Sequence, residues 1–187
     1  MSEELLIRHC APTLAGIKTG NLFSCRIESR EKTILQIREL NRKLVPKGLR
    51  IIPLRFTGER ALVYVYRPDD LRTDLQRGEV RDILRSEGYS SAAEDECVME
   101  LMRRVNARKE FPHEIGLFLS YPPEDVVGFI KNRGANSKLV GCWTVYGDAG
   151  RAKKLFGIYK QCTEHYESKW TQGTAIENLA VANRRKH

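Results

Sequence analysis

Residues 50–66 read RIIPLRFTGERALVYVY, and this stretch decides the fold class. Two runs rich in β-branched and aromatic residues, 50–56 and 60–66, flank a short turn that contains Gly58, which predicts an antiparallel hairpin. Pro53 cannot donate a hydrogen bond to a neighbouring strand, so we expect its strand to lie at a sheet edge or to contain a bulge. A hairpin argues against the all-parallel sheet of a Rossmann fold, and no Gly-rich nucleotide-binding motif follows an expected strand.

Further strands and helices are expected on both sides of the hairpin. Strands are predicted at 21–27, 115–119 and 139–146, the second of them continuously apolar and therefore buried on both faces. Helices are predicted from apolar residues at helical spacing and from Pro, Gly and acidic residues at their ends. Their ranges are 3–8, 11–18, 31–45, 68–88 with a break at Gly78, 91–108, 122–132, 149–166 and 175–182.

These elements predict a mixed α/β (α+β) fold, with an about five-stranded mixed sheet that contains one hairpin and is covered by helices. The order strand, helix, strand, helix between Ile115 and Tyr166 predicts a right-handed βαβ crossover. The chain shows no repeat and no long linker, so we expect a single domain over residues 1–187.

The composition excludes several classes of protein. A hydrophobic fraction of 41% is too high for a disordered chain, and the longest apolar run, Ala61 to Tyr66, is far shorter than the roughly 20 residues of a membrane span. Glu3 and Glu4 lie where a secretory signal would be basic. The five cysteines are odd in number and contain no C-x-x-C pair, which is typical of reduced thiols. We therefore expect a cytoplasmic protein that does not contact membranes.

The formal charge of +8 is concentrated near the two ends of the chain, and the sequence finishes with Arg184, Arg185, Lys186 and His187. A basic patch of this kind attracts polyanions, so a nucleic-acid-binding or protein-interaction module is the alternative function. The basic residues lack interleaved aromatic residues, which makes nucleic acid the less favoured partner.

The first candidate site is the segment that begins at His9 and Cys10. If the expected helix begins near residue 11, Cys10 lies at its N-terminus, where the helix dipole stabilises a thiolate, and His9 can act as its base. Thr13, Lys18 and Asn21 would then be ligand-binding residues, with Lys18 as an anion contact. The alternative is that Cys10 is a small buried apolar residue.

The second candidate site surrounds the apolar run 115–119. Tyr121 follows the expected strand where a helix begins, which is where open α/β sheets bind ligands. His113 precedes the strand and is a second candidate proton partner for Cys10, the alternative being a histidine that is hydrogen-bonded at the start of a strand. Trp143 and Tyr146 are interpreted as core and rim aromatic residues.

His9, Cys10, Cys162 and His165 could form a zinc site, because the last two share one face of a helix. The spacing matches no known zinc motif, and Cys162 also fits the apolar stripe of its helix, so we predict no metal site. No sequence motif indicates a cofactor.

Three motifs extend over nearly the whole chain: HCAPTLAG at 9–16, FPHEIGLFL at 111–119 with Tyr-Pro and Glu-Asp-Val soon after it, and Gly141 with Trp143 and Val-Tyr-Gly at 145–147. Through them the chain resembles a bacterial family of about this length that is labelled as a domain of unknown function. The resemblance implies a single-domain cytoplasmic protein and implies no activity.

The sequence therefore favours a small cytoplasmic protein that binds a ligand or depends on a thiol, with a pocket near Cys10 and His113. It leaves open whether the protein is an enzyme, which small molecule it binds and which oligomer it forms.

Overall fold

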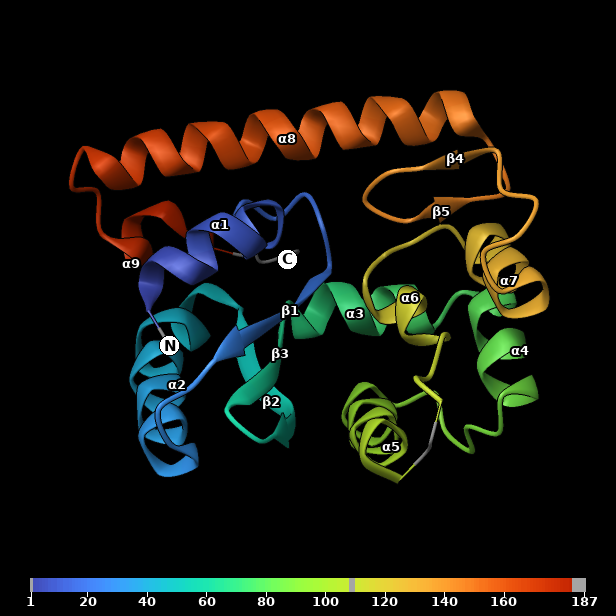
Figure 1. Ribbon diagram of the computed structural model, residues 1–187, viewed down its shortest axis with the longest axis horizontal. Helices are drawn as coiled ribbons and strands as arrows, with labels where there is room; N and C mark the ends of the chain where they lie inside the picture. The colour runs from blue at the N-terminus through green and yellow to red at the C-terminus, as the bar shows by residue number, and fades with distance from the viewer. Residues whose placement is uncertain (1, 108–109, 183–187) are drawn as a thin grey trace. The chain divides into compact units, whose positions relative to one another are not determined.

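The computed structural model describes residues 2–107 and 110–182 and has a mixed α+β fold (Figure 1). The chain divides into two compact units. The first consists of Met1–Asp69 and Gln161–His187, and the second of Asp70–Lys160. The expected single domain stays a prediction.

The first unit contains the predicted hairpin. Strands β1 (Gly20–Arg26), β3 (Arg60–Tyr66) and β2 (Arg50–Thr57) form an antiparallel sheet in that order. Pro53 lies in the edge strand β2, and the register shifts between Pro53 and Arg55, so both expectations for this proline are confirmed.

Helices of the first unit pack on the sheet through one apolar core. These are α1 (Glu3–Leu14), α2 (Arg30–Leu44) with a 3-10 turn at Val45–Lys47, the end of α8 (Ala149–Thr171), and α9 (Ile176–Leu179). The sequence predicted two short helices where α1 is continuous. The buried face of α1 continues past Pro12, from Leu6 to Leu14, so packing outweighs the hydrogen bond that the proline cannot make.

The edge strand β2 is bonded to α2 by an amide side chain. Asn41 Nδ2 donates to the carbonyl of Ile51 over 2.8 Å, and the Ile51 N–H donates to Asn41 Oδ1 over 2.9 Å. Both backbone groups of a buried residue at the sheet edge are thereby satisfied, as a neighbouring strand would satisfy them.

We expect Asn41→Ala to lower the free energy of unfolding by about 1–3 kcal/mol, because it leaves two buried backbone groups without partners. The measurement is urea unfolding followed by circular dichroism. Arg38→Ala, at an exposed position of the same helix, is the matched control and should change stability by less than about 0.5 kcal/mol. Equal stabilities of the two variants would contradict the inference that Asn41 satisfies the backbone groups of Ile51.

The second unit is mostly helical. It contains most of α3 (Pro68–Leu75), α4 (Gly78–Ser86), α5 (Glu94–Ala107), α6 (Ile115–Phe118), α7 (Pro123–Asn132) and the first part of α8, together with the short hairpin of β4 (Leu139–Val140) and β5 (Thr144–Val145). The predicted break at Gly78 and the helix at 122–132 are confirmed.

The prediction of one five-stranded sheet is wrong, because the five strands form a three-stranded and a two-stranded sheet. Residues 115–118 form the buried helix α6 instead of a strand, so the predicted βαβ crossover does not exist. A short apolar run has the same appearance in a buried strand and in a buried helical turn. The expected strand 139–146 is the β4–β5 hairpin with a turn at 141–143.

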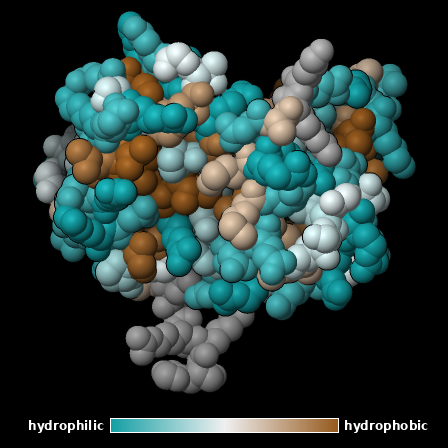
Figure 2. Space-filling model, turned by 90° about the horizontal axis from the view of Figure 1, so that it is seen from below, coloured by the Kyte–Doolittle hydropathy of each residue, from teal (hydrophilic) through white to brown (hydrophobic). Residues whose placement is uncertain are grey.

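Several large apolar side chains are exposed, among them Leu35, Met99 and Val140. Figure 2 shows one face of the molecule, on which hydrophilic residues surround smaller areas of hydrophobic residues. Within the described ranges, no helix has the length and apolar character needed to cross a membrane.

Candidate functional site

The second unit contains a pocket of about 200 Å³. Four aromatic side chains line it: Phe111, Tyr121, Phe129 and Trp143. The polar side chains on its wall are those of His113, Asp125 and Thr144. An apolar wall with a few converging polar groups is typical of small-molecule sites.

Asp125 determines the shape of one wall. The residue is 3% exposed, and its carboxylate accepts three hydrogen bonds, each over 2.7 Å, from the indole N–H of Trp143 and the backbone N–H groups of Tyr146 and Gly147. Asp125 lies in the first turn of α7, and all three donors lie in the segment that contains β5. One carboxylate therefore bonds this segment to the start of α7.

Glycines allow the same two segments to approach closely. A Cβ atom added to Gly128 would lie 2.4 Å from Cγ of Tyr146, and one added to Gly147 would lie 2.6 Å from Cγ of Glu124. Real Cβ atoms do not approach so closely, so a side chain at either position would displace its neighbour. Gly116 in α6 likewise has no room for a Cβ, which would lie 2.8 Å from Val126 Cγ2.

The aromatic rings are packed against one another. Tyr121 stacks on Trp143 with ring centroids 4.9 Å apart, and Trp143 meets Phe156 edge to face at 4.6 Å. The Tyr121 hydroxyl donates to the carbonyl of Cys142 over 3.2 Å, and burial raises the pKa of Tyr121 to about 12, so the phenol is neutral. On the other side, His113 contacts Phe129 edge to face at 4.9 Å.

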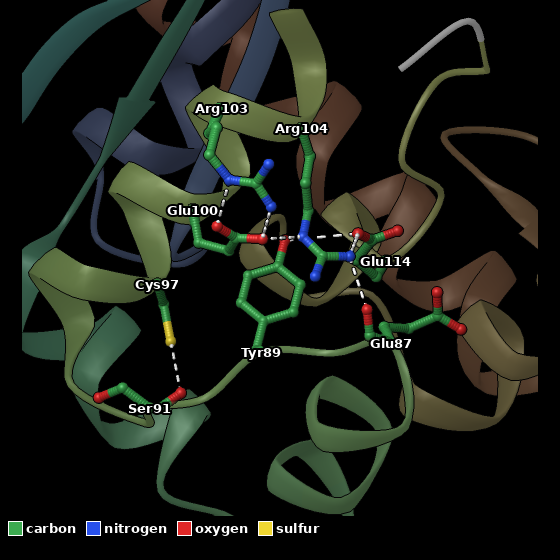
Figure 3. A network of polar contacts seen from close by, with 8 residues as sticks. All are labelled: Glu87, Tyr89, Ser91, Cys97, Glu100, Arg103, Arg104 and Glu114. Carbon is green, nitrogen blue, oxygen red and sulfur yellow. Dashed lines mark hydrogen bonds and ion pairs between the residues drawn. The ribbon is translucent and has the colours of Figure 1, made fainter. Parts of the chain in front are cut away.

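A buried polar network holds the segment that precedes α6 (Figure 3). Arg104 of α5 donates to Glu114 Oε1 over 3.3 Å, to the carbonyl of Glu87 over 2.6 Å and to Glu100 over 2.5 Å. The side chains of Arg104 and Glu114 are only 4% and 2% exposed. The guanidinium lies 4.3 Å from the ring centroid of Tyr89, a cation–π contact.

This network places its charges in fixed positions. Hydrogen bonds from Arg103 and Arg104 lower the pKa of Glu100 to about 2, so its carboxylate is ionised at neutral pH. Burial, with the nearby Glu114 carboxylate, raises the pKa of Tyr89. Because Glu114 directly follows His113, the network also fixes the backbone next to the pocket.

Two predicted site residues, His113 and Tyr121, line this pocket. His113 lies before α6 rather than before a strand, and Tyr121 follows α6. The Gly116 N–H donates to the backbone carbonyl of His113 over 3.2 Å, and no hydrogen bond joins the imidazole to another described residue. Because α6 lies where the strand was expected, the alternative of a histidine at the start of a strand is wrong.

The other predicted residues lie in the first unit, and the expected environment of Cys10 is wrong. Cys10 lies in the second half of the continuous helix α1, not at an N-terminus, and it is 0% exposed. Burial raises the pKa of its thiol, which opposes thiolate formation. His9 is exposed, stacks on Phe23 at 5.0 Å and has a pKa lowered by burial and by Arg8. The structure thus supports the alternative reading of Cys10 as a packing residue, and catalysis by Cys10, His9 and His113 stays a prediction.

The three ligand-binding residues predicted in the first unit, Thr13, Lys18 and Asn21, are each hydrogen-bonded or buried there. The Thr13 hydroxyl donates to Asn21 Oδ1 over 2.7 Å, and Lys18 is buried. Beside them, the buried Arg67 donates to the carbonyls of Thr13 and Leu14, each over 2.7 Å, where α1 ends. Ligand binding by these three residues stays a prediction.

In the described ranges, no group of three or more His, Cys, Asp or Glu side chains is arranged to hold a metal ion. The arrangement of His9, Cys10, Cys162 and His165 that was considered from the sequence is therefore not formed there.

The excess positive charge belongs to the first unit, which has 17 basic and 10 acidic residues, whereas the second has 15 and 14. Several exposed basic side chains of the first unit form ion pairs with acidic ones, among them Arg8–Glu4, Arg26–Glu59, Lys32–Glu28, Arg42–Glu39 and Lys43–Glu3. Arg184 to His187 lie outside the described residues. The basic-module alternative stays a prediction.

Sequence reasoning placed Phe111 and Asp125 in the second candidate segment without giving either side chain a role in binding, and it did not identify Phe129 or Trp143 as pocket residues. Asp125 was predicted as an acidic residue in a first helical turn, which it is, and Trp143 as a core residue. A signal was present in the sequence at 141–147, where glycines at both ends enclose Trp143 and Tyr146, since Gly141 leaves room for the ring of Phe156.

We expect Gly128→Ala to lower the free energy of unfolding by about 1–3 kcal/mol, because the added methyl group overlaps the ring of Tyr146. Gly157→Ala is the matched control in another helix, where a Cβ meets nothing within 4 Å. It should stabilise by up to about 1 kcal/mol through helix propensity. Thermal unfolding of both variants is the measurement, and a change of the same sign in both would refute the close contact.

We expect native-state thiol labelling with a maleimide to modify Cys142 first, at least about tenfold faster than Cys10, Cys25 or Cys97. Cys142 is exposed and the other three are buried. Mass spectrometry of peptides after short exposure reads out each site, and Cys142→Ser should abolish the fast phase. Rapid modification of Cys10 would disprove its burial.

The family model for DUF3793, described as a protein of unknown function, matches residues 6–180 of the chain. No curated protein and no solved structure matches it.

Proposed function

The chain belongs to the DUF3793 family of proteins of unknown function, and we propose that it binds a small molecule in the aromatic pocket of the second unit. One observation carries the proposal: a pocket of about 200 Å³ whose wall contains four aromatic rings and few polar groups. Its volume lies below the range of roughly 300–1,000 Å³ of drug-sized sites, which favours a ligand of about one ring.

The support around the pocket is consistent with a preformed site. Asp125 is a buried polar anchor in its wall, and the buried Arg104–Glu114 pair holds the backbone next to the lining residue His113. Because the walls of a preformed site are already ordered, binding loses less conformational entropy than it would in a flexible site. The proposal includes a reducing, cytoplasmic compartment, because all five cysteines are free thiols.

The two tryptophans of the chain provide the test. Trp143 lines the pocket, whereas Trp170 packs against the apolar core of the first unit. In a titration with phenol, we expect the indole N–H resonance of Trp143 to shift and that of Trp170 to remain in place. Trp143→Phe and Trp170→Phe assign the two resonances, and a shift of neither indole would contradict the proposal.

Removal of one wall should weaken this binding. We expect Phe129→Ala to raise the Kd for phenol about 3–10-fold, because it deletes an aromatic contact. Phe56→Ala removes a partly buried ring of the first unit and is the matched control. An equal loss in both variants would indicate a general effect on folding and would count against the pocket.

A further inference from the structure

We propose that the pocket selects an organic cation, with an ammonium group on a small apolar body. This ligand class rests on the binding function proposed above and concerns the charge of the ligand. Two features of the wall carry it: a buried carboxylate and four aromatic side chains.

The carboxylate is that of Asp125, which lines the pocket and is 3% exposed. Its three hydrogen bonds come from neutral N–H groups. In the part of the chain that the structure describes, no salt bridge reaches it. N–H dipoles stabilise a negative charge without cancelling it, so the wall keeps a net negative charge in a poorly solvated place.

The rings add to this preference. The faces of aromatic rings attract cations, and indole does so most strongly. The indole N–H of Trp143 donates to Asp125 Oδ2 over 2.7 Å, and a hydrogen bond to an anion polarises the group that donates it. The Trp143 ring is therefore more electron-rich than a free indole, and Tyr121 stacks directly on it.

Positive groups that would oppose a cation are few. No Lys or Arg of the described ranges lines the pocket, and His113 is the one basic side chain on this wall. Arg133 lines the neighbouring hollow together with His113 and is paired with Glu110 over 2.9 Å. Among the described residues, this wall therefore has no Lys or Arg side chain to offset the carboxylate of Asp125.

Three probes of nearly equal shape separate charge from apolar contact. They are choline, the neutral 3,3-dimethylbutan-1-ol and the anionic 3,3-dimethylbutanoate. At pH 8, with Trp143 fluorescence in the Trp170→Phe protein as readout, we expect choline to bind about tenfold more tightly than the neutral probe. The anion should bind most weakly.

Equal or tighter binding of the neutral probe would overturn the cation inference while the binding function stands. If neither phenol nor any of the three probes binds, the proposed function itself fails. The two failures are therefore distinguishable in one set of titrations.

A charge variant gives an independent test. His113→Lys places an ammonium group at this half-buried position of the wall, and His113→Gln removes the imidazole without adding charge. We expect His113→Lys to lower the ratio of choline affinity to neutral-probe affinity about tenfold, whereas in His113→Gln choline should still bind more tightly than the neutral probe. An unchanged ratio of these affinities in His113→Lys would overturn the inference.

Discussion

The carboxylate of Asp125 is the constraint on which the pocket depends. A buried charge is stable only when hydrogen bonds replace its lost hydration, and Asp125 receives three from one short segment. That segment has little regular structure of its own, since its hairpin consists of two strands of two residues each. The position of this segment therefore depends on the Asp125 side chain, which it surrounds.

Buried polar side chains perform the same task elsewhere in the chain. Arg104 bonds the carbonyl of Glu87 and the carboxylate of Glu114, Arg67 bonds the carbonyls where α1 ends, and Asn41 bonds both backbone groups of Ile51. In each case one side chain satisfies backbone or charged groups that no regular element pairs. Irregular segments can thus be as well defined as the helices beside them.

Sequence patterns predicted the structure correctly where interactions between residues close together in the chain decide it. The hairpin at 50–66, the edge position of Pro53 and the helix break at Gly78 were predicted, because turn geometry and missing donors act over a few residues. Prediction failed at 115–119, where a strand and a helical turn share one apolar pattern. It failed at Cys10, because its helix begins seven residues earlier and buries it.

The sequence by itself determined the mixed composition of helices and strands, the hairpin and two pocket residues, His113 and Tyr121. Only the tertiary structure decided that Trp143 and Phe129 face the same cavity and that Asp125 bonds across to the β4–β5 hairpin. The physical reason is the distance along the chain over which the deciding interactions act. Turns, caps and periodicity depend on neighbours along the chain, whereas a pocket wall depends on which side chains from distant parts of the chain can approach one another. Glycines at 128 and 147 permit such an approach, but the sequence does not indicate which segment lies opposite each of them.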